Sequence, residues 1–283
     1  MGVFVSWATR LADESFLHTL RAEARLAAPV VALGVSTAFM QEELAYADYV
    51  LSGEPEGAFP LLCDRLLTGE ARLPRMVSPA SLNAPGYDAE GLLTDLDALP
   101  FPAWDVLPVE RYAALSVLSS RGCSSGCSWC PYVVAQGRHY RAMSPARVVA
   151  ELVEDVRRYH PRRIIFRDPV FAADRQRVVD ICHWILAERS LRPGKDLRWE
   201  CESRPDHFDR ELLCLMSLAG CVGIKVGLES TDPALLQREG RCDQLENAFA
   251  YLEQVRAFVA DCARYGIASR LFVMVGLPGQ TLE

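Results

Sequence analysis

Three cysteines stand close together in the stretch RGCSSGCSWCPY, residues 121–132, at Cys123, Cys127 and Cys130. The thiolate is the metal-binding form of cysteine, and clustered thiolates repel one another unless a metal holds them. The stretch is rich in serine and glycine, so it does not resemble a buried apolar face. The spacing C-x3-C-x2-C therefore predicts a loop that binds a metal or a metal cluster.

Four interpretations of the cysteines compete. A structural zinc site needs four ligands, and no second C-x2-C pair or H-x3-H pair follows at a suitable spacing. A redox disulfide between Cys127 and Cys130 leaves Cys123 unexplained. An iron–sulfur cluster usually takes four cysteines, and a set of three leaves one iron free for a substrate or cofactor. The fourth interpretation, inert core thiols, suits the isolated cysteines Cys63, Cys182, Cys214, Cys242 and Cys262.

The region from residue 113 to the end must position this loop. It alternates apolar runs with helical patterns, which predicts βαβ units and a parallel sheet. We expect strands at 114–120, 164–166, 197–201, 222–229 and 270–276, with helices between them. Ser144 and Pro145 start one helix, and His160-Pro161 ends it. Five such strands fit part of a (β/α) barrel, in which the chemistry lies at the carboxyl ends of the strands. The cysteine loop directly follows the first expected strand.

The first part of the chain also predicts an α/β arrangement. Strands are expected at 3–5, 30–35 and 49–51, and helices at 15–28 and 58–67. These elements are too few for a complete doubly wound domain, so we expect part of a Rossmann-like parallel domain. Prolines and glycines recur in 71–112 without a lasting period, which is typical of a linker. The expected domains are therefore 1–70, a linker at 71–112, and a partial barrel at 113–283.

The cysteine spacing after the first strand of a parallel barrel resembles the radical S-adenosylmethionine (SAM) enzymes. That resemblance implies a 4Fe–4S cluster on Cys123, Cys127 and Cys130, whose open iron binds SAM through the amine and carboxylate of its methionine part. Reduction of the cluster then cleaves SAM to a 5′-deoxyadenosyl radical. Trp129 matches the family's usual aromatic residue before the third cysteine, and Tyr132 falls where the family contacts adenine.

Four further segments resemble the SAM-binding strands of that family. The resemblance implies that Asp168 lies where the backbone receives the SAM amine, although the sequence here is Asp-Pro and not the Gly-Gly-Glu of some members. Arg204 would bind the SAM carboxylate, with a salt bridge as the alternative role. The VGLES segment implies ribose contacts, for which capping of a helix N-terminus is the rival. VMVGLPGQ implies an approach to adenine, with a simple turn as the rival. The residues taken from these last two segments are Glu229, Ser230, Gly276 and Pro278.

The stretch ADYVLSGEPEGAFPLLCDRLL, residues 47–67, resembles the end of the cobalamin-binding domain of one radical SAM subfamily. That subfamily includes methyltransferases acting on unactivated carbon or phosphorus, and ring-forming enzymes. No D-x-H-x2-G motif is present, and His18 stands inside a helical pattern, so a histidine ligand to cobalt is not expected. The chain stops just after the fifth strand, where the family continues, and we expect a chain truncated at both ends.

Composition narrows the function classes. The chain has 283 residues, half of them apolar, and a formal net charge of −7, which argues against a broad nucleic-acid surface. The apolar run at 28–35 is far shorter than the ~20 residues that cross a bilayer, and the start lacks a signal-peptide pattern. Ten cysteines in a chain of this length are too sparse for a disulfide scaffold and suit a reducing cytosol. We therefore expect a cytoplasmic protein with no membrane or nucleic-acid partner.

The expected function is cobalamin-dependent methylation of an unactivated position in a small-molecule substrate. Its cofactors would be a 4Fe–4S cluster, SAM and cobalamin, with an electron donor such as flavodoxin or ferredoxin. The alternatives are a ring-forming radical SAM enzyme, an iron–sulfur electron carrier, and an inactive remnant. The sequence singles out no substrate-side catalytic acid or base.

Overall fold

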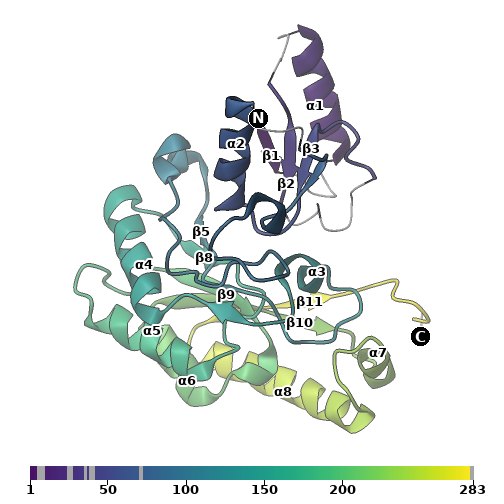
Figure 1. The fold of residues 1–283 in the computed structure, drawn as a ribbon. Helices are drawn as coiled ribbons and strands as arrows, with labels where there is room; N and C mark the ends of the chain where they lie inside the picture. The colour runs from purple at the N-terminus through teal and green to yellow at the C-terminus, as the bar shows by residue number, and fades with distance from the viewer. Residues whose placement is uncertain (5–9, 24–27, 35–36, 38–41, 70–72, 281–283) are drawn as a thin grey trace. The chain divides into compact units, whose positions relative to one another are not determined.

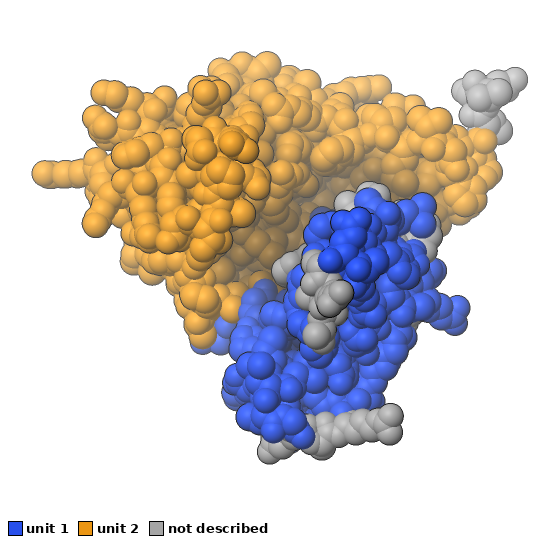
Figure 2. Space-filling view, turned by 90° about the horizontal axis from the view of Figure 1, so that it is seen from above, with its two compact units in different colours: residues 1–95, 131–139 blue, residues 96–130, 140–283 orange. Residues whose placement is uncertain are grey.

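The computed structural model describes residues 1–4, 10–23, 28–34, 37, 42–69 and 73–280 (Figure 1). The chain divides into two compact units, shown in blue and orange in Figure 2. The first comprises residues 1–95 and 131–139, and the second comprises 96–130 and 140–283. None of the helices in the described part has the length and apolar character needed to span a bilayer.

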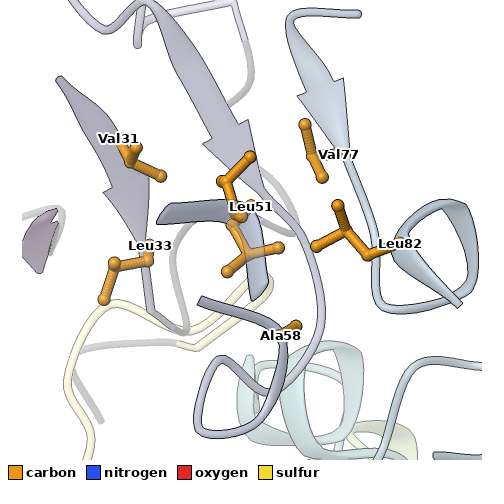
Figure 3. Close-up of a cluster of buried hydrophobic side chains, with 7 residues drawn as sticks. Val31, Leu33, Leu51, Ala58, Val77 and Leu82 are labelled. Carbon is orange, nitrogen blue, oxygen red and sulfur yellow. The ribbon is translucent and has the colours of Figure 1, made fainter. Parts of the chain in front are cut away.

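The first unit is built on a parallel sheet with the strand order β1-β2-β3-β4. Both faces of this sheet are covered, because its strands alternate apolar side chains between two clusters. Leu17 packs on the side of Val30, Ala32 and Val50. The other side is the cluster of Figure 3. The elements are β1 (Gly2–Phe4), α1 (Arg10–Glu23), β2 (Val31–Leu33), β3 (Tyr49–Leu51), α2 (Ala58–Thr68), β4 (Met76–Val77) and, from the later segment, α3 (Tyr132–Gln136).

Most elements expected in this unit are present. The strand at 49–51 and the helix at 58–67 are confirmed. The expected strands at 3–5 and 30–35 and the helix at 15–28 overlap β1, β2 and α1, but their bounds were partly wrong. The helix begins earlier, at Arg10, and Ala28, Val30 and Gly34 lie outside these elements, while residues 5, 24–27 and 35 lie outside the described part. The region expected to be a linker contains β4, which extends the sheet. The two residues of β4 are too few to give a hydrophobic period in the sequence, so this strand was not predicted. The functional boundaries 1–70, 71–112 and 113–283 stay a prediction, since compactness does not define a cofactor-binding domain.

The second unit contains a five-stranded, wholly parallel sheet with the order β11-β10-β9-β8-β5. Neighbouring strands follow one another along the chain with helices between them, as in part of a (β/α) barrel, so the predicted fold class is confirmed (Figure 1). The elements are β5 (Leu115–Val117), β6 (Ser120–Arg121), β7 (Arg141–Ala142), α4 (Pro145–Tyr159), β8 (Ile164–Phe166), α5 (Arg175–Ala187), β9 (Trp199–Ser203), α6 (Arg210–Leu218), β10 (Cys221–Glu229), α7 (Pro233–Arg238), α8 (Leu245–Arg264) and β11 (Ala268–Val273).

Local sequence explains where these helices begin and end. Ser144 accepts a hydrogen bond from the Arg147 amide at the start of α4, and His160 ends the helix in a left-handed conformation at φ 47°. Asp174, Asp209 and Asp232 cap α5, α6 and α7 in the same way as Ser144 caps α4. These caps fix the points at which each strand-to-helix loop must turn.

The two faces of the five-stranded sheet differ in chemistry. On one face, Phe166, Phe171 and Trp199 form a buried aromatic cluster with ring centroids 4.7 to 5.6 Å apart. The opposite face carries alternating residues of the same strands, and it includes several charged side chains. Glu200 bonds Arg163 and Arg270 there. Glu202 pairs with Lys225 at 2.9 Å and with Arg167 at 3.6 Å.

Three expected strands have other bounds in the structure. The strand expected at 197–201 is β9, Trp199–Ser203, and the one expected at 270–276 is β11, which ends at Val273. The expectation of a strand over 114–120 was wrong at its end, because β5 stops at Val117. Ser120 and Arg121 instead form β6, which pairs antiparallel with β7. The cysteine loop therefore follows a short two-stranded ribbon and not the parallel strand itself.

Candidate functional site

The cysteine loop runs from Gly122 to Pro131, between β6 and α3. All ten cysteines of the chain lie in the described part and carry free thiols. Within the loop, Cys127 is buried with 8% exposure, while Cys123 and Cys130 are half-buried. The Cys130 amide bonds the Cys127 carbonyl at 3.4 Å, so the second half of the loop is a tight turn.

Asp168 holds the root of this loop. It is fully buried and accepts hydrogen bonds from the Ser119 amide at 2.7 Å and from the Ser119 and Ser120 hydroxyls, both at 2.6 Å. Arg177 donates to the Ser119 carbonyl and hydroxyl, both at 2.9 Å. Burial raises the pKa of Asp168, although the two serines and Arg177 oppose that shift. The side chain expected near the SAM amine is therefore occupied in supporting the backbone before Cys123.

A second segment, Glu239–Arg241 after α7, grips the middle of the loop. The Ser128 amide donates to the Glu239 carbonyl at 3.0 Å, and the Ser128 hydroxyl donates to the Glu239 carboxylate. Gly240 has φ 71°, and a Cβ there would lie 2.5 Å from the Gly126 carbonyl oxygen. Only glycine fits this approach, because any side chain would strike the backbone of the loop.

Arg241 connects the same segment to a cysteine of the loop. The residue is 9% exposed, and its guanidinium donates to the Cys127 sulfur at 3.8 Å, to the Gly227 carbonyl at 3.0 Å and to the Tyr251 hydroxyl at 2.7 and 2.9 Å. A Cβ on Gly227 would clash with the Glu229 carboxylate and with Arg241, so these two side chains share the space beside Gly227.

Arg204 and Cys123 line one cavity of about 260 Å³, together with Gly122, Tyr140, Asp206 and His207. The guanidinium of Arg204 bonds both carboxylate oxygens of Asp206, at 2.8 to 3.3 Å, and approaches the Ser125 hydroxyl at 3.4 Å. Burial would raise the pKa of Asp206, but Arg204 lowers it below its usual value. Arg204 thus already holds one carboxylate, and an incoming carboxylate must share or displace it.

The remaining expected contacts lie at strand ends and turns. Glu229 ends β10 with φ 65°, and burial raises its pKa while Arg241 opposes that rise. The Ser230 hydroxyl accepts from the Asp232 amide at 3.0 Å. The Gly276 amide donates to the Gln280 side chain at 2.6 Å, and the Pro278 carbonyl accepts from Arg238. The contacts of Gly276 and Pro278 are those of a simple turn, the alternative role given for the VMVGLPGQ segment.

The two expected aromatic contacts lie at the far end of the loop. Trp129 is half-buried within it, and Tyr132 is 44% exposed as the first residue of α3. Because α3 belongs to the other compact unit, the position of Tyr132 relative to the cavity is not described.

The donor set of the loop suits an iron–sulfur cluster. Among the described residues, no three Cys, His, Asp or Glu side chains are gathered so as to hold a single metal ion. A cubane makes a different demand, because each thiolate binds a separate iron and the sulfurs stand further apart than around one ion. Three free thiols in one loop, with the Arg241 cation beside one of them, fit such a cluster by chemistry.

Several residues of the site were not found from the sequence. They are the arginines Arg177 and Arg241, the grip residues Glu239 and Gly240, and Asp206. The only local signal was Gly240, a glycine directly after a helical pattern. Nothing in the spacing indicates that the turn after α7 packs against a loop more than 100 residues earlier, since the Cys127 and Arg241 positions are 114 apart.

Comparison with known proteins gives consistent results. Residues 117–283 match the family model described as the Radical SAM superfamily. An uncharacterised methyltransferase of Pyrococcus horikoshii is 28% identical over 246 residues, covering 83% of this chain and 50% of that protein. The hopanoid C-2 methylase of Rhodopseudomonas palustris is 27% identical over 256 residues, covering 90% and 46% respectively. The chain thus spans about half the length of these curated relatives.

Solved structures show the same fold. The radical SAM methyltransferase TsrM of Kitasatospora setae, solved with tryptophan and a SAM analogue, superposes with a TM-score of 0.78 at 21% identity, covering 99% of this chain and 57% of that one. The cobalamin-dependent radical SAM enzyme OxsB, solved with aqua-cobalamin, gives a TM-score of 0.68 at 20% identity, with 98% and 42% coverage.

Proposed function

The chain belongs to the radical SAM superfamily, and we propose that Cys123, Cys127 and Cys130 bind a 4Fe–4S cluster with one iron left for SAM. The family prediction made from the cysteine spacing is confirmed, as are the cluster and SAM as cofactors of this family. The observation that carries the proposal is the loop itself. Its cysteines are free thiols, and Cys123 shares a cavity with Val170 and Arg204, which follow β8 and β9 at the carboxyl ends of the parallel strands, where barrel enzymes place their chemistry.

The chemistry that such a cluster supplies is one-electron reduction of bound SAM, which cleaves it to methionine and a 5′-deoxyadenosyl radical. The protein's share is to hold and orient SAM and to exclude water. Arg204 lines the cavity next to Cys123 and would bind the SAM carboxylate, with Asp206 fixing the plane of its guanidinium. The buried Glu229 would accept hydrogen bonds from the ribose hydroxyls.

Other SAM contacts carry over from the family resemblance as proposals. Asp168 would act through the backbone that it anchors, because its carboxylate is occupied by the two serines. The remaining proposed contacts are Trp129, Tyr132, Ser230, Gly276 and Pro278.

The reaction is proposed to be methylation that uses cobalamin. The curated relatives named above are methyltransferases, which favours methyl transfer over ring formation. Cobalamin is assigned to residues 1–70, a domain followed by a linker at 71–112 and the SAM-binding region at 113–283. Gly34 and Ser52 directly follow strands β2 and β3, so small residues lie at the carboxyl edge of that parallel sheet, where doubly wound folds bind their ligands. The substrate would be a small molecule, and the electron donor a protein such as flavodoxin or ferredoxin.

Anaerobic reconstitution of the chain with iron and sulfide tests the proposal. We expect a cluster absorbance band and an EPR signal after reduction with dithionite, and 5′-deoxyadenosine or S-adenosylhomocysteine after addition of SAM. Replacing any loop cysteine with alanine should abolish the cluster, whereas Cys214→Ala, a half-buried thiol of α6, should not. A full cluster without SAM turnover would favour an electron carrier or an inactive remnant. Cluster loss in the Cys214 variant alone would contradict the assignment.

A further inference from the structure

The side chain of Arg241 is the buried cation that touches the cysteine loop. It reaches the loop from the turn after α7 and places Nη1 3.8 Å from the Cys127 sulfur. Hydrogen bonds to the hydroxyl of Tyr251 and the carbonyl of Gly227 hold the rest of the guanidinium in place. An arginine cannot lose its proton in a protein, so this group is a permanent positive charge.

The groups that accept hydrogen bonds from Arg241 do not neutralise its charge. Tyr251 and the Gly227 carbonyl are neutral, and the ring of Tyr251 lies 5.2 Å from the guanidinium carbon. Glu229 shares the space beside Gly227 and interacts electrostatically with Arg241, although no ion pair within 4.0 Å joins them among the described residues. In a buried setting a charge acts more strongly on its neighbours than in water.

We infer that Arg241 raises the reduction potential of the cluster through its contact with the Cys127 sulfur. The inference rests on the cluster proposed above. Reduction adds one electron from the donor to the cluster, with no bond formed or broken, so the reduced cluster carries one more negative charge. A cation that donates a hydrogen bond to a cluster sulfur stabilises this reduced state, and hydrogen bonds and net charge are the terms that set such potentials.

Redox titration followed by EPR, on reconstituted protein without SAM, tests this role. The variants are R241Q, which removes the charge, R241K, which keeps it, and R175Q, a control that removes an exposed arginine paired with Asp209. At a fixed solution potential we expect R241Q to lower the ratio of reduced to oxidised cluster at least tenfold, which is about 59 mV for a one-electron couple. R241K should recover part of this loss, and R175Q should match the wild type. A fully loaded R241Q with the wild-type potential would overturn the inference.

If R241Q does not fold, a second measurement tests the contact between Arg241 and the cluster without that variant. Wild-type protein labelled with 15N only in arginine guanidinium groups is reduced and examined by pulsed EPR. We expect a 15N coupling to the cluster that is retained in R175Q and lost in R241K. A spectrum that is the same in wild type and R241K would overturn the inference. Absence of any cluster from the wild-type chain would remove the proposed function, and the inference with it, whereas an unchanged potential in a loaded R241Q removes the inference alone.

Discussion

At the scale of a single residue, Asp168 holds the backbone that precedes the cysteine loop. Its two oxygens accept three hydrogen bonds from the serines that precede the cysteine loop, in a position without solvent exposure. The family resemblance suggested a cofactor contact here, whereas the bonding in the structure is internal. The sequence could not distinguish these roles, because a carboxylate after a strand serves either one.

Replacing Asp168 should separate the two roles. Asp168→Ala leaves buried donors without a partner and should cost about 3 kcal/mol of unfolding free energy. Asp168→Asn keeps one acceptor, and the serine hydroxyls can rotate, so it should cost about 1 kcal/mol. Chemical denaturation of both variants measures this. SAM binding to D168N is measured by equilibrium dialysis. If this variant has normal stability but no longer binds SAM, the carboxylate itself contacts the cofactor.

Asp155 in α4 gives the molecule a specific dependence on pH. It is 2% exposed, and one of its oxygens has no hydrogen-bond partner among the described residues. Burial, followed by the charges of Glu151 and Glu154, raises its pKa to about 7, while Arg147 opposes the shift. The unfolded chain ionises this group near pH 4, so the folded state holds the proton longer. Stability should therefore fall as the pH rises from about 4 to about 7, and level off above that.

Thermal melting between pH 5 and pH 8 checks this expectation. Asp155→Asn should remove the part of the pH dependence of stability that this group causes. At pH 8 the variant should melt at a higher temperature than the wild type, and its unfolding free energy should be larger by up to about 4 kcal/mol, since one pKa unit corresponds to about 1.4 kcal/mol. Asp64→Asn, at an exposed position of α2, is the control and should keep the wild-type slope. Parallel slopes in D155N and the wild type would refute the raised pKa.

At the scale of elements, the contact between the turn after α7 and the cysteine loop depends on the glycine at position 240. Gly240→Ala would place a methyl group 2.5 Å from the Gly126 carbonyl oxygen at a left-handed backbone position. Gly266→Ala, at φ 69° after α8, meets nothing within 4 Å and carries the backbone strain alone. We expect about 1–2 kcal/mol of destabilisation for Gly266→Ala, and clearly more for Gly240→Ala.

Iron content per chain after reconstitution adds a local measurement to the glycine comparison. Gly240→Ala should lower cluster loading because it displaces the loop, while Gly266→Ala should leave it unchanged. Equal loading in the two variants would mean that the turn after α7 does not position the loop.

The predictability of the elements follows their length and caps. Ser144 marked the start of α4 and His160-Pro161 its end, and the structure places the two ends there. The five parallel strands were found because each is a short apolar run between helices. The elements that were missed, β4, β6, β7 and α3, span two to five residues. Such short elements are fixed by tertiary contacts, which leave no period in the sequence.

At the scale of the whole molecule, the sequence predicted three cysteines as cluster ligands but did not predict their surroundings. Three cysteines in one loop are recognised by local spacing. The residues that position them, Arg177, Glu239 and Arg241, come from distant segments that meet only in the folded sheet. Local motifs were therefore predictable, and the contacts between segments required the structure.

The charged face of the five-stranded sheet bears on which molecules can lie against it. Four cations and two carboxylates stand there, in the groups around Glu200 and Glu202. An apolar molecule bound against this face would remove water from these charged groups. Desolvation of a charge costs free energy unless new polar partners replace the lost hydration. Compounds with oxygen or nitrogen groups would suit this lining far better than a bare polycyclic hydrocarbon.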